Sequence, residues 1–242
     1  MTILITGGTG RLGRHVVAAL RARTADLRIL SRRSGDDHVV ADLATGDGLT
    51  AALDGVDTVV HLATSRSKDI EQTRRLLDAM AGTGAHLIFI SIVGVDRIPY
   101  GYYRDKVASE TAIERSGVPF TIIRVAQFHG FVHEVLEAQR RLPVTMVLPV
   151  SAQTIHMPEV AERLVEIVDA GPSGRVADLG GPEQLTLREY ARQWQAARGV
   201  RRPIWALHLP GKTMAAFTAG HHMPGLPGAG RVTYREFLEN GE

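Results

Sequence analysis

The sequence predicts an α/β fold built on one doubly wound parallel sheet. Short apolar runs rich in Ile, Val and Leu recur along the chain, and segments with apolar residues at helical spacing lie between several of them. The apolar runs do not alternate strictly with polar residues, which is typical of parallel strands buried on both faces. Repetition of strand, helix and strand then implies right-handed crossover connections.

Six of these runs are predicted to be buried strands, at residues 2–7, 26–32, 38–43, 58–64, 86–91 and 120–125. The amphipathic segments between them predict helices at 14–23, 70–84 and 106–117. After about residue 130 the pattern loosens, and the remaining predictions are helices at 132–142, 158–171 and 186–199 and a strand at 175–181. In the last helix, Thr186 and Glu189 have the spacing of a capping box.

The composition indicates a single domain and excludes several classes of protein. A chain of 242 residues with 44% hydrophobic content can form one sizeable core, expected at about 1–150, with a small C-terminal, substrate-side region at about 151–242. The absence of cysteine excludes disulfides and thiolate chemistry. A net charge of +2 does not favour nucleic-acid binding. No apolar run reaches the roughly 18–20 residues that span a bilayer, so a cytoplasmic protein is expected.

The first predicted strand leads into TGGTGRLG, residues 6–13, whose glycines recur at every third position. Glycine at a strand-to-helix turn lets backbone N–H groups approach a pyrophosphate, and the start of the helix adds partial positive charge. The alternative is a tight turn without a ligand. The position directly after a buried strand favours a bound nucleotide, with contacts expected from Gly7, Thr9, Gly10, Arg11, Leu12 and Gly13.

The end of the second strand favours NADP(H) over NAD(H). A site for NAD usually has an acidic residue there, which holds the ribose 2′-hydroxyl. In this chain Arg32 and Arg33 follow Ser31, and Arg11 can add positive charge from the glycine loop. An arginine fork can bond a 2′-phosphate with two N–H groups. The alternative is that both arginines are solvated loop residues in a chain rich in arginine.

Two further strand ends supply candidate cofactor contacts. Asp42 and Leu43 end the third strand, where Asp42 can accept a hydrogen bond from the adenine amino group. The alternative for Asp42 is a helix cap or turn residue. Leu62, Ala63 and Thr64 end the fourth strand, where a sheet of this type passes its backbone along the cofactor. These three residues are expected to act through main chain and shape.

Taken together, the motifs resemble those of an atypical short-chain dehydrogenase/reductase of the NmrA-like group. The resemblance rests on TGGTGRLG, ADL, HLAT, FISIVGVD, YYRDK and SGVPFTIIRVAQF, which cover about residues 1–130, and on HMPEVAERL and GGPEQLTLREYA further on. It implies a Rossmann-type core, a bound nicotinamide cofactor and, in many members, hydride transfer. Some NmrA-like members instead act as cofactor-sensing regulators without turnover, so the fold alone does not fix the activity.

Tyr102 and Lys106 have the Y-x-x-x-K spacing of that superfamily's working pair, and residues four apart share one helix face. Tyr103, three before Lys106, could also approach it. Only three of the 28 basic residues are lysines, and an ammonium near a phenol favours the phenolate. The resemblance implies that Lys106 also binds the nicotinamide ribose and that Ser91 holds the substrate oxygen. The alternative is a set of half-buried packing tyrosines.

The loop after the sixth strand supplies the predicted pocket wall, which consists of Gln127, Phe128 and His129. A mostly apolar pocket suits a small hydrophobic carbonyl compound or a quinone. For His129 a hydrogen-bonded structural role is the alternative. No metal site is expected, because His221 and His222 lack ligand partners at a recognised spacing.

The sequence therefore predicts an NADPH-dependent reductase of a small apolar substrate. A non-catalytic sensor of NADP(H) and an epimerase or dehydratase that uses tightly held NAD remain the alternatives.

Overall fold

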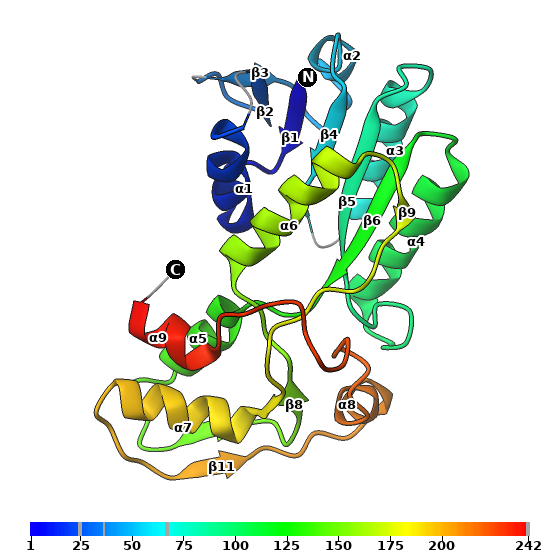
Figure 1. Cartoon of the computed structure of the whole chain (residues 1–242). Helices are drawn as coiled ribbons and strands as arrows, with labels where there is room; N and C mark the ends of the chain where they lie inside the picture. The colour runs from blue at the N-terminus through cyan, green and yellow to red at the C-terminus, as the bar shows by residue number, and fades with distance from the viewer. Residues whose placement is uncertain (24–25, 36, 66–67, 241–242) are drawn as a thin grey trace. The chain divides into compact units, whose positions relative to one another are not determined.

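The apolar runs predicted as strands lie together in one seven-stranded sheet of the computed structural model, which describes residues 1–23, 26–35, 37–65 and 68–240 (Figure 1). The strand order is β3-β2-β1-β4-β5-β6-β9. The bounds are β1 Ile3–Thr6, β2 Leu27–Ser31, β3 His38–Val40, β4 Thr58–His61, β5 His86–Ile92, β6 Phe120–Val125 and β9 Gly174–Arg175. Neighbours from β3 to β5 pair in parallel, as do β6 and β9. The predicted doubly wound parallel sheet is confirmed.

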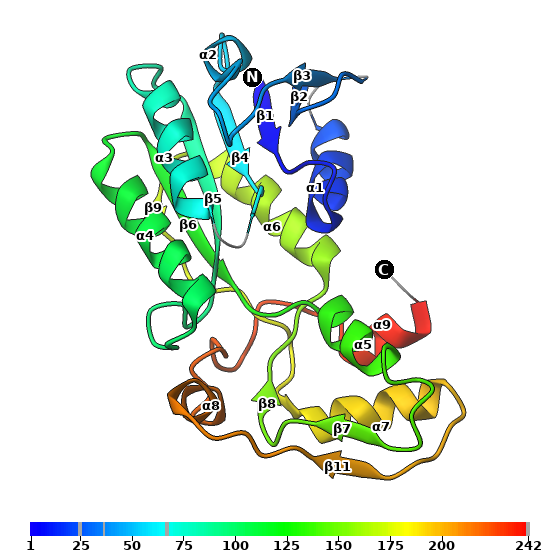
Figure 2. The ribbon, with the colours of Figure 1, turned by 180° about the vertical axis from the view of Figure 1, so that it is seen from behind.

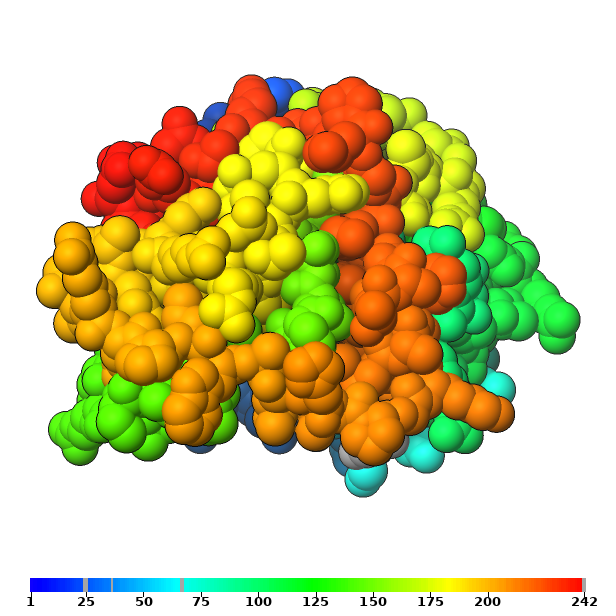
Figure 3. Space-filling view, turned by 90° about the horizontal axis from the view of Figure 1, so that it is seen from below, coloured from blue at the N-terminus to red at the C-terminus, as the bar shows by residue number. Residues whose placement is uncertain are grey.

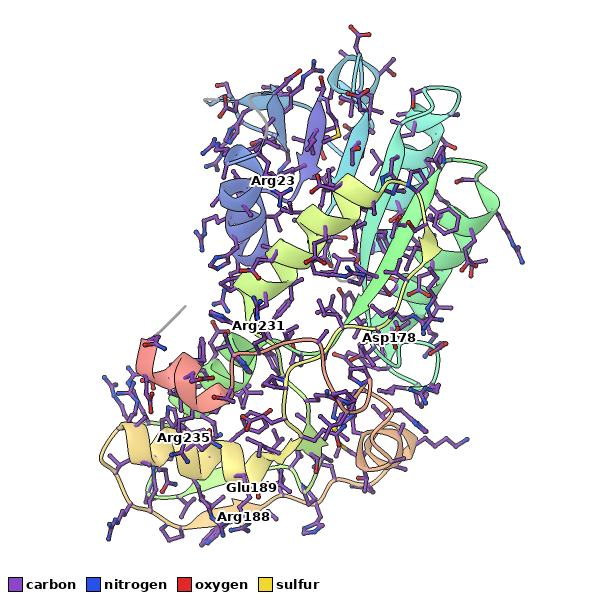
Figure 4. All side chains as sticks on the ribbon, in the orientation of Figure 1. Arg23, Asp178, Arg188, Glu189, Arg231 and Arg235 are labelled. Carbon is purple, nitrogen blue, oxygen red and sulfur yellow. The ribbon has the colours of Figure 1, made fainter. Side chains whose placement is uncertain are left out.

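Helices cover both faces of this sheet. The chain forms α1 (Arg11–Arg21), a short α2 (Leu49–Ala52), α3 (Asp69–Met80), α4 (Gly101–Arg115) and α6 (Met157–Ala170). Figures 1 and 2 show α6 over one face and α3 beside α4 over the other. Arg23, labelled in Figure 4, pairs with Asp169 at 2.5 Å and so joins the end of α1 to α6.

The core follows from the period of two along each strand, because successive side chains point to opposite faces of the sheet. On one face Leu4, Val59 and Leu87 pack in a single cluster with Leu76 and Met80 of α3. The residues next to them along the strands point to the other face and are just as deeply buried. They include Ile3, Ile5, Val60 and Ile88. Both faces of the sheet are therefore buried, as the continuous apolar runs predicted.

The described residues group into two compact units. The first unit comprises Met1–Ser91, Gly101–Arg124 and Val160–Ala177, and the second comprises Ile92–Tyr100, Val125–Glu159 and Asp178–Glu242. The first unit contains nearly all of the sheet and its helices. The predicted layout of one domain with a C-terminal region from about residue 151 remains a prediction.

The second unit is built from short elements around an aromatic core. Its elements are α5 His129–Glu137, β7 Thr145–Val147, β8 Ser151–Ala152, β10 Leu185–Thr186, α7 Leu187–Ala197, β11 Ile204–Ala206, α8 Lys212–Thr218 and α9 Tyr234–Asn240. The strands form two small sheets, in which β10 pairs with β8 and β11 with β7. Tyr190, Trp194 and Tyr234 are fully buried at its centre. Residues after about 180, yellow to red, make up much of the surface in Figure 3.

The predicted capping box is confirmed at the start of α7. Thr186 Oγ1 accepts from the backbone N–H of Glu189, and the Glu189 carboxylate, labelled in Figure 4, accepts from the backbone N–H of Thr186. Other boundaries differ from the prediction. The helix predicted at 132–142 begins at His129 and ends at Glu137.

Across the described residues, no helix combines the length and the apolar character needed to cross a bilayer.

A buried ion pair fastens α4 to the sheet. Arg124 of β6 donates from Nε and Nη2 to the two carboxylate oxygens of Glu110, at 2.9 and 2.6 Å. Both side chains are buried, so each charge depends on the other for its compensation.

Glu110→Ala should therefore lower the free energy of unfolding by about 3–5 kcal/mol, because it leaves Arg124 buried without its partner. Glu166→Ala removes the exposed partner of Arg163 on α6 and serves as the control, with an expected loss below about 1 kcal/mol. Urea unfolding followed by circular dichroism measures both. Equal losses in the two variants would contradict the assignment.

Candidate functional site

The glycine loop is shaped by close backbone contacts. Gly7 has a φ of +71°, and a Cβ there would lie 2.7 Å from the backbone nitrogen of Ala63. A Cβ on Gly13 would lie 2.1 Å from the carbonyl oxygen of Gly7. A real Cβ does not approach backbone atoms so closely, so these positions require glycine. The backbone of the loop therefore lies in close contact with both the start of α1 and the end of β4.

The start of α1 suits an anion. Gly10 occupies the N-cap position with no side-chain cap, and the first turn contains no acidic residue. The partial positive charge of the helix N-terminus is therefore not compensated from within the first turn. This arrangement is the one that binds the pyrophosphate of a dinucleotide in a strand–loop–helix unit.

A cleft of about 1150 Å³ in the first unit runs along the carboxyl ends of the strands. Its lining comes from the loop after β1, from the segment after β2, from the turn after β3, from the end of β4 and from α3. The lining residues are Gly7, Thr9, Gly10, Leu30, Ser31, Arg32, Arg33, Ser34, His38, Ala41, Asp42, Leu43, Ala44, Leu62, Ala63, Thr64, Ser65 and Gln72. Because β1 stands between β2 and β4, the cleft lies where the strand order reverses, which is the ligand-binding crevice of such sheets.

Most of the predicted cofactor residues come together in this cleft. They are Gly7, Thr9, Gly10, Arg32, Arg33, Asp42, Leu43, Leu62, Ala63 and Thr64. The predicted contacts Arg11, Leu12, Gly13 and Lys106 are not among the lining residues. Gly13 instead packs beneath the loop, and Lys106 is buried in α4. Their contacts with a cofactor remain predictions.

Sequence reasoning missed several residues of the cleft. Ser34 directly follows Arg33, so a wider window around Arg32 would have included it, whereas His38 lies at the start of β3. Gln72 reaches the cleft from α3, and its place depends on how that helix packs, which no local pattern reveals.

The β2 end of the cleft is the cationic one. Arg32 and Arg33 are both exposed there, and the backbone N–H of Arg33 donates to Ser31 Oγ at 3.1 Å, which turns the chain at this point. Asp42, at the end of β3, accepts from the backbone N–H of Ala44 at 2.7 Å. One of its oxygens therefore stabilises a turn, while the residue also lines the cleft.

At the β4 end, a chain of polar contacts leads from the cleft wall into the protein. The hydroxyl of Tyr102 lies 3.0 Å from Thr64 Oγ1. Thr64 Oγ1 in turn donates to Asp69 Oδ2 at 2.8 Å. Asp69 Oδ2 lies 3.3 Å from Lys106 Nζ. Tyr102 and Lys106 both belong to α4, and Thr64 and Asp69 link them.

Hydrogen bonds to both oxygens of the Asp69 carboxylate stabilise its buried ion pair with Lys106. Asp69 Oδ1 accepts from the backbone N–H of Ser65 at 2.5 Å and from Ser65 Oγ at 3.3 Å. Burial pushes the pKa of the Asp69 carboxyl upward, but the charge of Lys106 and the hydrogen bonds from Ser65 and Thr64 outweigh this, so the pKa lies below its usual value. Asp69 is therefore a carboxylate at neutral pH.

The packing of α3 against α4 holds Asp69 and Lys106 next to each other. One turn beyond Asp69, Thr73 Oγ1 lies 3.4 Å from Ser109 Oγ, and Ser109 lies one turn beyond Lys106. Residues three and four apart share a helix face, so the two contacts stack along one seam. The seam is polar and buried, and it aligns the start of α3 with the start of α4.

The Lys106 ammonium lies over an aromatic ring, that of Phe89. Lys106 Nζ stands 4.7 Å from the centre of the Phe89 ring, and the His61 ring stacks on Phe89 at 5.7 Å. Burial and then the charge of Lys106 lower the pKa of His61 to about 3, so its imidazole is neutral at physiological pH. Its Nδ1 lies 2.6 Å from Thr6 Oγ1 at the end of β1.

Ser91, predicted to hold the substrate oxygen, lies one residue before the end of β5 and belongs to the first unit. It is buried, and its hydroxyl has no hydrogen-bond partner among residues 1–23, 26–35, 37–65 and 68–240. A buried hydroxyl left in this state is a candidate for a ligand contact, since buried polar groups are normally bonded.

The predicted pocket wall belongs to the second unit. Gln127 Oε1 accepts from the backbone N–H of Phe128 at 3.1 Å. His129 is buried, and its ring nitrogens lie 2.6 Å from Thr154 Oγ1 and 3.0 Å from the carbonyl oxygen of Val232. Burial lowers the pKa of His129 to about 4. These contacts describe a hydrogen-bonded histidine, and the role of all three residues as a pocket wall remains a prediction.

The second unit also has a cleft of its own, of about 270 Å³. Its lining is entirely apolar and comprises Phe131, Val132, Val135, Leu136, Met146, Val147, Leu148, Leu187 and Leu207. Within the part of the chain that the structure describes, no group of three or more His, Asp or Glu side chains is arranged to hold a metal ion.

Comparison with known proteins agrees with the geometry of the first unit. The sequence model of a family described as NAD(P)H-binding matches residues 7–170. The match covers the glycine loop, the strand ends that line the cleft, and the helix that contains Tyr102 and Lys106.

Individual relatives have diverse names. The chain is 30% identical over 215 residues to the (4-alkanoyl-5-oxo-2,5-dihydrofuran-3-yl)methyl phosphate reductase of Streptomyces griseus, covering 84% of this chain and 75% of the relative. It is 28% identical over 169 residues to the photosystem II assembly factor Ycf39 of Trieres chinensis, covering 62% of this chain and 52% of the relative, and so spans about half of that protein.

Among solved structures, the NADPH-dependent quinone oxidoreductase QOR2 of Escherichia coli, complexed with NADPH, superposes with a TM-score of 0.85 at 20% identity, covering 98% of this chain and 99% of that one. At this identity the likeness is one of fold.

Gly13→Ala tests the shape of the loop. The added Cβ would lie 2.1 Å from the Gly7 carbonyl oxygen, so the loop must shift, and we expect NADPH affinity to fall at least about tenfold. Gly101→Ala is the matched control, because a Cβ there has no described atom within 4 Å. Fluorescence titration with NADPH measures both, and normal affinity in Gly13→Ala would argue against a pyrophosphate at this turn.

Proposed function

The chain belongs to the NAD(P)H-binding family of atypical short-chain dehydrogenases/reductases, and on that premise we propose that it reduces a small, mostly apolar carbonyl compound or quinone with NADPH. The observation that supports this most strongly is the position of Tyr102, whose hydroxyl contacts Thr64 at the β4 end of the cleft. A phenol at that end can give a proton to a substrate oxygen.

The order of the strand ends supports one orientation of the proposed cofactor. Arg32 and Arg33 stand at the β2 end, where two guanidinium groups suit a 2′-phosphate on the adenosine ribose. The glycine loop and the start of α1 would hold the pyrophosphate between these ends. Thr64 and Tyr102 would then lie on the nicotinamide side. Bound in this way, the cofactor supplies the hydride.

The protein supplies the proton and the orientation. Tyr102 donates its proton to the substrate oxygen as the carbon accepts the hydride, which leaves a phenolate and a reduced product. Ser91 donates a hydrogen bond to the same oxygen; its hydroxyl is buried and has no partner within the described ranges. Lys106 is held by Asp69, and its contact with the nicotinamide ribose is part of the proposal.

The substrate class follows from the chemistry that these groups can perform. A phenol and a serine hydroxyl can both bond one oxygen, which suits a carbonyl or quinone oxygen. The names of the Streptomyces reductase and of the Escherichia coli quinone oxidoreductase both specify compounds with conjugated carbonyl groups. We therefore place the substrate of this chain in that broad class.

Tyr102→Phe should reduce NADPH-dependent turnover of a panel of quinones and carbonyl compounds at least about 100-fold, because the proton donor is lost. NADPH affinity should stay within a few-fold of normal. Tyr103→Phe, on the same helix, is the matched control and should keep its activity. Full activity in Tyr102→Phe would contradict proton donation by Tyr102. Tight NADPH binding by wild-type protein with no turnover on any compound would favour a sensor instead.

Arg32→Ala combined with Arg33→Ala should weaken binding of NADPH much more than binding of NADH, by about tenfold or more, because only NADPH has the 2′-phosphate. Arg104→Ala, an exposed arginine on α4 outside the cleft, controls for loss of positive charge. The measurement is the ratio of the NADH dissociation constant to the NADPH dissociation constant in each variant. An unchanged ratio in the double variant would contradict the role of the two arginines in cofactor preference.

A further inference from the structure

Thr64 joins the wall of the cleft to the buried ion pair, and its hydrogen bonds fix the direction of the Tyr102 proton. Thr64 Oγ1 donates to Asp69 Oδ2 at 2.8 Å and lies 3.0 Å from the Tyr102 hydroxyl. An ionised carboxylate can only accept, and a threonine hydroxyl has one proton to give. Since that proton goes to Asp69, Tyr102 must be the donor in its bond with Thr64.

Asp69 can direct Thr64 because its own position is fixed. Its side chain is 2% exposed, and that of Lys106 is 6% exposed. Both carboxylate oxygens are engaged, one by Ser65 and the other by Thr64 and Lys106. A buried polar network whose members are bonded in this way is rigid. Thr64, in contrast, is exposed at the cleft, so its hydroxyl can turn.

We propose that Thr64 and Asp69 are positioning residues for Tyr102, and that Thr64 accepts a hydrogen bond from the phenol but donates one to the phenolate. This inference rests on the proposed role of Tyr102 as proton donor. When the O–H bond of Tyr102 breaks, the proton forms a new O–H bond on the substrate oxygen, and hydride from the reduced nicotinamide forms the new C–H bond. Thr64 then turns its proton from Asp69 to the phenolate, while Asp69 keeps its contacts with Lys106 and Ser65.

This arrangement favours the phenol over the phenolate. Beside the phenol, the Thr64 hydroxyl makes two hydrogen bonds, one accepted from Tyr102 and one donated to the Asp69 carboxylate. Beside the phenolate it makes only one, because its single proton leaves Asp69 to reach Tyr102. Loss of the Thr64 hydroxyl therefore removes more stabilisation from the phenol, and Tyr102 should become easier to deprotonate when Thr64 is replaced by an apolar residue of the same shape.

The test is a pH titration by NMR of protein with isotope-labelled tyrosine rings. The chain has five tyrosines, and the signal that disappears in Tyr102→Phe belongs to Tyr102. In Thr64→Val the titration midpoint of this signal should fall by about one pH unit. Thr64→Ser, which keeps the hydroxyl, should titrate as the wild type does. An unchanged midpoint in Thr64→Val would overturn the proposal.

A second measurement separates this role from a merely structural one. Thr64→Val should lower kcat about tenfold, because the phenol loses the hydrogen bond that fixes its position, while its melting temperature and its NADPH affinity stay close to normal. Thr64→Ser should restore kcat. Normal kcat in Thr64→Val would also contradict the proposal. Full activity in Tyr102→Phe would instead overturn the proposed function, and the NMR result for Thr64 would still stand.

Discussion

The ion pair between Asp69 and Lys106 is the interaction on which the candidate site depends. Transfer of two charges out of water is costly, and their attraction repays this cost only when the remaining polar atoms are bonded as well. Here Ser65, Thr64 and the Phe89 ring surround the pair. The pair thereby ties the loop after β4, the start of α3 and the start of α4 to one another. The first two segments supply part of the wall of the cleft, and α4 supplies the phenol that contacts Thr64.

The charges along the cleft have different origins at its two ends. At the β2 end they are side-chain cations that are open to solvent, Arg32 and Arg33. In the middle they are partial charges of the backbone at the start of α1. At the β4 end the lysine charge is matched by a carboxylate, so the pair has no net charge. This gradient suits a ligand that has phosphates at one end and an uncharged ring at the other.

The sequence was most informative where local geometry determines the residue type. The glycine loop, the buried strands and the capping box of α7 could be predicted because turns, two-sided burial and helix caps each restrict the residues that fit. Asp69 could not be predicted, because an acidic residue in the first turn of a helix is common and its partner lies 37 positions away in α4. Gln72 was missed for the same reason: its position depends on the packing of α3 against the sheet. In the second unit, strands of two or three residues are too short to give a periodic signal.

The scarcity of lysine has a practical consequence. Lys68 and Lys212 are exposed, whereas Lys106 is enclosed by its partners. Acylating reagents attack deprotonated amines that solvent can reach, so they would modify the first two lysines and the amino terminus and spare the third. Acylation of the native protein would thus leave the amine of Lys106 unmodified.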